Sequence, residues 1–283
     1  MILAIIGPTA VGKTKLSIEL AKKYNAIIIN CDAMQVYQGL DIGTAKVTSE
    51  EKEGITHELL DFVPVTQNYT VYDYQKDARK LLEKYQGHNI IFVGGTGLYL
   101  KSALYDYRFY EETTTNSYDN LTNEELYNLA LAKDKNMTIH PNNRKRLVRF
   151  LNKEIQEYVE PKPLYNFKII GLTTSRDILY DKINKRVDVM FQSGLLTEAK
   201  SFYDQGIRSK ALETGIGYKE LYQYFDNKIT LEEAKDLIKK NSRHYAKRQY
   251  TFFNHQLDVK WFNTNYEDFS KTIKEVEDYI ENC

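Results

Sequence analysis

The stretch Gly7-Pro8-Thr9-Ala10-Val11-Gly12-Lys13-Thr14 decides the fold. It follows a short apolar run, Ile2 to Ile6, which is typical of a strand buried on both faces of a parallel sheet. It precedes apolar residues that recur at helical spacing. The pattern G-x-x-x-x-G-K-[ST] between a strand and a helix is the phosphate-binding P-loop. We therefore expect an α/β protein with a P-loop NTPase-like parallel sheet and flanking helices.

The P-loop predicts a binding site for a polyphosphate. Its backbone N–H groups and the N-terminus of the following helix form a cradle for anions. Lys13 would add a positive charge, and the hydroxyl of Thr14 would be a ligand for Mg²⁺. Because such a cradle recognises phosphates and not the group attached to them, these residues leave open whether the ligand is a nucleotide such as ATP.

Length and composition bound the class of protein. The 283 residues suggest about two domains. No apolar run approaches the roughly 20 residues of a membrane span, and the N-terminus lacks the basic region of a signal peptide. Cys31 and Cys283 match no metal-ligand spacing, so we expect a cytoplasmic protein in a reducing compartment. The 39 basic and 39 acidic residues give a net charge of zero, so any nucleic-acid contact would need a local basic face.

Asp32 follows a second apolar strand, Ala26 to Asn30. Ligands of open α/β sheets bind outside the carboxyl ends of the strands, so Asp32 is expected to face the same crevice as Lys13. Its carboxylate could hold Mg²⁺ through water, or it could accept a proton from a nucleophile. Both roles stay open from the residues alone.

A third strand, Asn89 to Val93, also ends in glycine-rich sequence, Gly94-Gly95-Thr96-Gly97. Two such strand ends facing one crevice suggest a site with backbone amides on two sides. The segment from Gly39 to Lys46 is also rich in small residues and could approach a ligand closely, although it is a weak signal.

The pattern changes at about residue 105. We interpret 105–165 as a helical insertion, with helices over 122–134 and 141–159, and 1–104 together with 166–283 as the P-loop core. In the core we expect strands over 167–172 and 259–262 and helices over 230–254 and 266–281. The long helix over 230–254 begins with a capping box, Thr230-x-x-Glu233.

Two predicted helices carry basic clusters: the helix over 141–159 contains Arg144-Lys145-Arg146-Leu147-Val148-Arg149, and the long helix over 230–254 contains the other. On the long helix, residues at four-residue spacing form one broad stripe, which contains Lys239, Lys240, Arg243, His244, Lys247 and Arg248. The carboxylates of this helix fall in its first turns, so we expect the stripe to lack acidic partners. A nucleic-acid contact and a solvated helix face remain equally good interpretations of such a pattern.

Six segments that occur in this order together resemble the tRNA dimethylallyltransferase family. They are Gly7–Thr14, Asp32–Tyr37, Asp41–Lys46, Gly94–Thr96, Gly215–Glu220 and Tyr245–Gln249. The resemblance extends from Ile2 to about Trp261, and the combination is specific although the P-loop alone is not. No zinc finger follows the last predicted strand, which indicates the bacterial type.

The resemblance implies that the P-loop holds the diphosphate of dimethylallyl diphosphate rather than ATP. The exocyclic amine (N6) of an adenosine adjacent to the tRNA anticodon, flipped out of its stack, would attack C1 of the allyl group and release diphosphate. Asp32 would accept the hydrogen of the amine, Thr9 would support the diphosphate from the P-loop, and Thr96 would lie near the reacting base. Mg²⁺, Lys13 and Thr14 would stabilise the charge that develops on the diphosphate.

The resemblance also implies binding residues. The diphosphate would be bound by Gly7, Pro8, Thr9, Ala10, Val11, Gly12, Lys13, Thr14 and one arginine, either Arg176 or Arg186. The tRNA would be bound by Asp32, Ala33, Met34, Gln35, Thr96, Lys145, Arg146, Leu147, Val148, Arg149, Gly217, Tyr218, Lys219, Lys247, Arg248 and Gln249. Val11 and Ala33 stand where the family usually has serine, and Phe253-Asn254 replaces a common aromatic–arginine pair.

Two alternatives have different chemistry. A small-molecule or nucleotide kinase with the same fold would turn over ATP. A non-catalytic RNA-binding protein would have a degenerate P-loop, and the intact Lys13, Thr14 and Asp32 argue against it. We expect tRNA and dimethylallyl diphosphate as partners, no membrane contact, and a monomer.

Overall fold

The computed structural model describes residues 1–109, 114–153 and 160–282. Contacts within the chain divide it into two compact units. The larger unit consists of Met1–Tyr105 and Pro163–Cys283, and the smaller unit is Asp106–Lys162. The segment that the sequence indicates as an insertion, 105–165, contains the smaller unit.

Within the described residues, six parallel strands form the sheet of the larger unit, in the order β3-β2-β4-β1-β5-β6. The strands are β1 (Ile2–Ile6), β2 (Ala26–Asn30), β3 (His57–Glu58), β4 (Asn89–Gly94), β5 (Phe167–Thr173) and β6 (Lys260–Asn263). This confirms the predicted parallel α/β fold. The sequence did not predict β3, because a strand of two residues is too short to show a periodic pattern.

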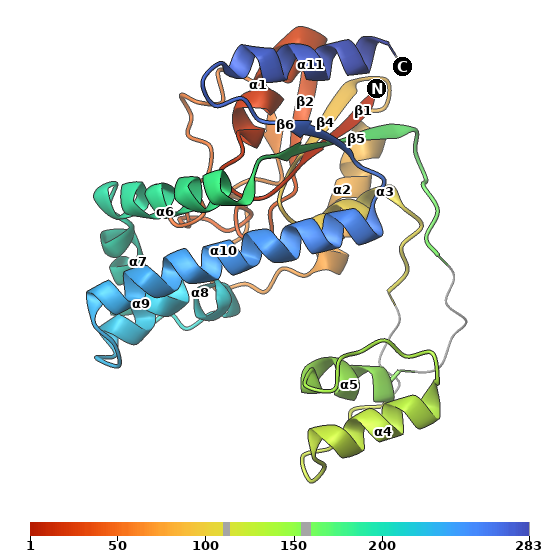
Figure 1. Cartoon of the computed structure of the whole chain (residues 1–283), viewed down its shortest axis with the longest axis vertical. Coiled ribbons are helices and arrows are strands. Elements are labelled where there is room, and N and C mark those ends of the chain that lie inside the picture. The colour runs from red at the N-terminus through yellow and green to blue at the C-terminus, as the bar shows by residue number, and fades with distance from the viewer. Residues whose placement is uncertain (110–113, 154–159, 283) are drawn as a thin grey trace. The chain divides into compact units, whose positions relative to one another are not determined.

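Helices cover both faces of the sheet (Figure 1). They are α1 (Lys13–Tyr24), α2 (Val71–Lys84), α3 (Gly97–Leu104), α6 (Arg176–Gln192), α7 (Leu195–Asp204), α8 (Lys210–Thr214), α9 (Tyr218–Phe225), α10 (Leu231–Gln256) and α11 (Phe269–Glu281). Side chains of β1 alternate between the two faces: Leu3 and Ile5 join the core under α1 and α11, and Ala4 and Ile6 join the core under α2 and α3. None of the helices formed by the described residues combines the length and apolarity that crossing a bilayer requires.

The capping box predicted for the long helix is confirmed. Thr230 Oγ1 accepts from Glu233 N at 3.2 Å, and Glu233 Oε2 accepts from Thr230 N at 2.7 Å. Helix α10 ends at Gln256, two residues later than predicted.

The smaller unit contains α4 (Asn123–Lys133) and α5 (Arg144–Leu151), which pack around Leu126, Ala130 and Leu147. The prediction of one helix over 141–159 is wrong at its start, because Asn143 caps α5 by accepting from Arg146 N. It is also wrong after Leu151, where the side chain of Asn152 donates to Asn116 O and the chain turns. Residues 154–159 of that prediction lie outside the described residues.

Candidate functional site

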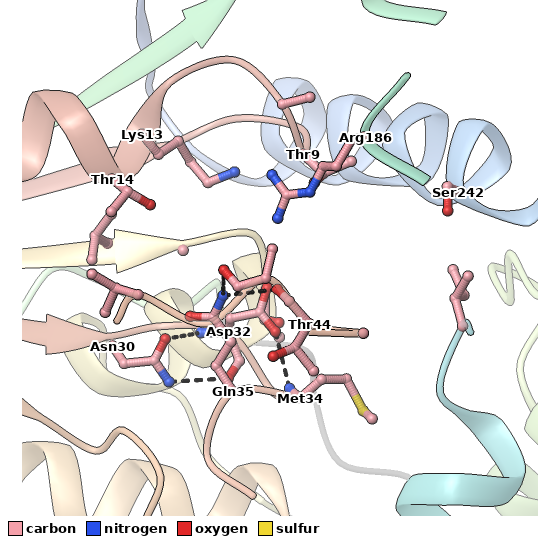
Figure 2. Close-up of a pocket in the computed structure, with 18 of the residues that line it drawn as sticks. Thr9, Lys13, Thr14, Asn30, Asp32, Met34, Gln35, Thr44, Arg186 and Ser242 are labelled. Carbon is pink, nitrogen blue, oxygen red and sulfur yellow. Dashed lines mark hydrogen bonds between the residues drawn. The ribbon is translucent and has the colours of Figure 1, made fainter. Parts of the chain in front are cut away.

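A cavity of about 870 Å³ lies at the carboxyl ends of the strands (Figure 2). Its wall combines the P-loop, the turn after β2, the end of β4, one side of α6, the segment before α9 and one side of α10. The structure brings to this wall most of the site residues predicted for the larger unit: Thr9, Ala10, Gly12, Lys13, Thr14, Asp32, Ala33, Met34, Gln35, Thr96, Arg186, Gly217, Lys219, Arg248 and Gln249.

The P-loop has the backbone of an anion cradle. Ala10 and Gly12 have positive φ angles of 68° and 90°, and Gly12 is the N-cap of α1. Lys13 Nζ donates to Pro8 O at 2.7 Å. Burial lowers the pKa of Lys13 to about 8, with a further lowering by the charge of Arg186 and an opposing effect of Asp32. The free protein therefore holds a cation that an anionic ligand would stabilise.

The two candidate arginines lie in different surroundings. Arg186 lines the cavity, and its Nε atom is buried without a hydrogen-bond partner among the described residues. Burial lowers the pKa of Arg186, while the charges of Asp32 and Glu51 raise it. Arg176, at the start of α6, is exposed, stacks over the ring of Tyr180 at 5.1 Å and does not line the cavity.

Asp32 lies in a turn that its neighbours hold in place. Asp32 N donates to Asn30 Oδ1 at 3.1 Å, and Asp32 Oδ1 accepts from Met34 N at 2.9 Å. Thr96 Oγ1 accepts from Ala33 N at 3.0 Å, which ties this turn to the end of β4. Figure 2 shows Asp32 on one side of the cavity and Lys13, Thr14 and Arg186 on the other.

Helix α10 supplies residues to the wall that the sequence analysis missed. Ser242 and Tyr245 line the cavity together with Gln249, whose Nε2 donates to Gly95 O at 2.9 Å. The spacing of i, i+3 and i+7 on one helix face could have indicated them. Burial raises the pKa of Tyr245, and the charge of Asp32 raises it further, although a hydrogen bond with Thr96 has the opposite effect.

The weakly indicated segment from Gly39 to Lys46 also belongs to the site. Gly43, Thr44 and Ala45 line the cavity. Gln35 Nε2 donates to Thr44 O and Ala45 O, at 3.1 and 3.3 Å. The carboxylate of Glu198 accepts from the backbone N–H groups of Asp41, Ile42 and Gly43, which fixes the loop from its other side.

The prediction that the basic stripe of α10 lacks acidic partners is wrong for Lys239, and Arg243 has a neutral partner. Lys239 pairs with Asp188 at 2.6 Å, and Arg243 donates to Asn184 at 2.6 Å, both on α6. The spacing of residues along one helix cannot reveal partners on another helix. Four members of the stripe are exposed, namely Lys240, His244, Lys247 and Arg248.

Other predicted tRNA-binding residues differ in exposure. On α5, Lys145, Arg146 and Arg149 are exposed and Val148 is half-buried. Leu147 is fully buried in the core of the smaller unit. Tyr218 is also fully buried, and its hydroxyl donates to Glu198 at 2.6 Å. The side chains of Leu147 and Tyr218 therefore contribute to packing.

Comparisons with known proteins give concordant results. A model of the IPP transferase family matches residues 35–256. The chain is similar to the tRNA dimethylallyltransferase of Anoxybacillus flavithermus, with 45% identity over 99% of this chain and 96% of that protein. It is also similar to the tRNA dimethylallyltransferase of Bacillus subtilis, with 44% identity over 93% of this chain and 90% of that protein.

Two solved structures are similar over nearly the whole chain. The full-length tRNA isopentenylpyrophosphate transferase from Bacillus halodurans is 41% identical, with a TM-score of 0.79 over 99% of this chain and 95% of that chain. A eukaryotic dimethylallyltransferase acting on tRNA is 27% identical, with a TM-score of 0.79 over 99% of this chain and 79% of that chain.

The lowered pKa of Lys13 predicts how stability depends on pH. Between pH 8 and 10.5 an ordinary lysine at position 13 of the unfolded chain binds more protons than the buried Lys13 of the folded protein, so the contribution of Lys13 to the free energy of unfolding rises with pH. Lys13→Met lacks this contribution. In denaturant titrations without ligand, any stability advantage of Lys13→Met over the wild type should therefore be largest near pH 7 and shrink above pH 8. A difference that stays constant over this range would contradict the prediction.

Proposed function

The chain belongs to the IPP transferase family, as its six segments predicted, and on that premise we propose that it transfers the dimethylallyl group of dimethylallyl diphosphate to the N6 amine of an adenosine adjacent to the tRNA anticodon. The observation that carries the proposal is the composition of one cavity. An anion cradle with Lys13 and Arg186 faces a carboxylate, Asp32, across it. A group transfer from a diphosphate to an amine needs an anion cradle for the diphosphate and a proton acceptor for the amine, and both must lie at the same cavity.

The reaction forms one bond and breaks another. The lone pair of the N6 amine forms a bond to C1 of the allyl group, and the C1–oxygen bond breaks as its electron pair leaves with diphosphate. The amine loses one proton, which the carboxylate of Asp32 accepts. Contacts from Met34 N and Asn30 Oδ1 fix the turn that carries Asp32, so the carboxylate is pre-oriented for this role.

The diphosphate would lie against the P-loop and Arg186. The backbone N–H groups of the loop and Lys13 would bind its oxygens, with Thr9 beside them at the cavity wall. The buried Nε of Arg186 lacks a protein partner among the described residues, and a buried donor without a partner is costly. A phosphate oxygen would supply that partner, which supports Arg186 over the exposed Arg176 as the diphosphate-binding arginine.

The donor set at the P-loop fits Mg²⁺. Thr14 lines the cavity and offers a hydroxyl oxygen, and the diphosphate would offer further oxygens. Mg²⁺ usually keeps several waters and is held by one or two protein groups together with substrate phosphates. When bound, the ion would neutralise part of the charge on the leaving diphosphate.

The tRNA would contact basic side chains at the protein surface. Lys247 and Arg248 are exposed on α10, and Lys145, Arg146 and Arg149 are exposed on α5. Exposed lysines and arginines bind phosphates of the nucleic-acid backbone without reading sequence. Arg248 also lines the cavity, together with Gly217, Lys219 and Gln249, and these residues would lie beside the flipped adenosine.

The transfer assay separates this function from its alternatives. Purified protein is incubated with labelled dimethylallyl diphosphate, unmodified tRNA and Mg²⁺, with and without ATP. We expect label in tRNA and free diphosphate in equal amounts, whether or not ATP is present. ATP consumption coupled to product formation would instead indicate a kinase, and tRNA binding without transfer would indicate a binding protein.

Substitution of each arginine distinguishes their roles. Arg186→Gln should weaken binding of inorganic diphosphate by about tenfold to a hundredfold, because it removes a charged hydrogen-bond donor from a buried site. The matched control, Arg176→Gln, removes an arginine from the same helix and should leave the affinity unchanged. Isothermal titration calorimetry measures the affinity of both variants for inorganic diphosphate. Equal losses in the two variants would contradict the assignment of Arg186.

Substitution of Asp32 separates proton acceptance from metal binding. Asp32→Asn keeps the shape of the side chain but removes its basicity, so the single-turnover rate should fall by about 10²- to 10⁴-fold. Diphosphate affinity and the Mg²⁺ concentration for half-maximal rate should change little. The measurement is the single-turnover rate across a Mg²⁺ titration for both proteins. Recovery of the rate at high Mg²⁺ would make Asp32 a metal-holding residue instead.

A further inference from the structure

We propose that Thr264 and Tyr266 are positioning residues that hold the P-loop in its anion-binding conformation, an inference that rests on the diphosphate site of the proposed function. The segment between β6 and α11 contacts two successive carbonyl groups of the loop. Thr264 Oγ1 donates to Val11 O at 2.9 Å, and Tyr266 Oη donates to Ala10 O at 3.1 Å. We name these two contacts the carbonyl clamp.

Because a peptide bond is planar, a contact that fixes its C=O group also fixes the direction of its N–H group. In a trans peptide, the C=O of one residue and the N–H of the next point in opposite directions. Binding of the Ala10 carbonyl by Tyr266 therefore directs the N–H of Val11 away from Tyr266. In the same way, binding of the Val11 carbonyl by Thr264 directs the N–H of Gly12 away from Thr264.

The side of the loop opposite the clamp is the side on which the proposal places the phosphate. Ala10 and Gly12 line the cavity, whereas neither Thr264 nor Tyr266 does. The proposal therefore places the clamp on the outer side of the loop and directs the two N–H groups toward the cavity, where a phosphate oxygen would accept from them. A row of inward backbone N–H groups is what makes such a loop bind anions.

The loop needs this support because its backbone is in an uncommon conformation. Ala10 has a φ of 68°, in the left-handed region that residues with a Cβ rarely adopt. Conformations of this kind persist when surrounding contacts enforce them. The carbonyl clamp supplies two contacts that enforce this conformation and that the loop alone lacks.

Thr264 is held in place by its surroundings, and Tyr266 keeps the proton that it donates. Thr264 is buried, and its own N–H donates to Thr173 O at 2.8 Å. Burial raises the pKa of Tyr266 to about 12, so its hydroxyl keeps its proton at neutral pH and remains a donor. The segment continues into α11, which packs beside α1 (Figure 1). Phe269, the first residue of α11, lies against the loop, because a Cβ on Gly12 would be 2.6 Å from its ring.

The test removes the hydroxyl groups and measures binding of inorganic diphosphate by isothermal titration. The double variant Thr264→Val with Tyr266→Phe should raise the Kd about tenfold, because two hydrogen bonds that pre-orient the loop are lost. Each single variant should have a smaller effect. The KM for dimethylallyl diphosphate should rise in parallel, whereas tRNA affinity should not change.

Two control variants separate positioning from general stability. Thr264→Ser keeps the donor and should retain the wild-type Kd. Tyr24→Phe removes a hydroxyl that contacts Glu281 at 3.4 Å between α1 and α11, without touching the P-loop, and should also retain it. If the double variant does not fold, Tyr266→Phe alone, at a half-buried position, gives the answer.

The outcomes decide between distinct conclusions. Wild-type affinity in a folded double variant, or in folded Tyr266→Phe where the double variant fails, would overturn the inference and leave the proposed function intact. A loss of affinity of the same size in Tyr24→Phe would also overturn it, because the effect would then be one of stability. A wild-type protein that binds no diphosphate would overturn the proposed function and the inference together.

Discussion

The parallel pairing of β1, β2 and β4 is the constraint on which the site depends. Ile6 pairs with Gly94, and Asn30 pairs with Val93, so three chain segments leave the sheet at the same edge. The ladder continues past the strands, because Cys31 N donates to Val93 O at 2.7 Å. A Cβ on Gly94 would lie 2.2 Å from the backbone of Cys31, so only glycine allows this approach. The P-loop, Asp32 and Thr96 come together because of this register.

The arrangement that permits binding is costly in the free protein. Lys13 and Arg186 are like charges in a buried site, and desolvation is the largest influence lowering the pKa of each. Asp32 offsets part of this cost, since its charge raises both pKa values. An anion that binds only the folded state would remove more of the cost, and its binding free energy would add to the stability of the fold. The buried charges that would bind the diphosphate therefore lower the stability of the fold.

The sequence predicts those features that depend on a local pattern or on the rule that ligands bind outside the carboxyl ends of parallel strands. The P-loop, the paired glycines at the end of β4 and the position of Asp32 all follow from motifs attached to recognisable strands. The choice between Arg176 and Arg186 does not follow, because both lie on α6 and differ by ten residues, or about 15 Å along the helix axis. Which end of α6 reaches the cavity depends on tertiary packing. The ion pair of Lys239 with Asp188 is likewise hidden, since its partners are on different helices.

The charges of the cavity match the redistribution of charge that the proposed transfer would involve. As the C–N bond forms, positive charge develops on the amine and negative charge on the departing diphosphate. In the proposed binding mode the carboxylate of Asp32 would face the amine, and the P-loop dipoles, Lys13 and Arg186, which lie across the cavity, would face the diphosphate. Fixed charges of this kind stabilise a transition state without reorganising when it forms, and they act more strongly where water is excluded. A P-loop by itself would stabilise only the leaving group, and in the proposed reaction the opposing carboxylate of Asp32 would serve the amine nucleophile.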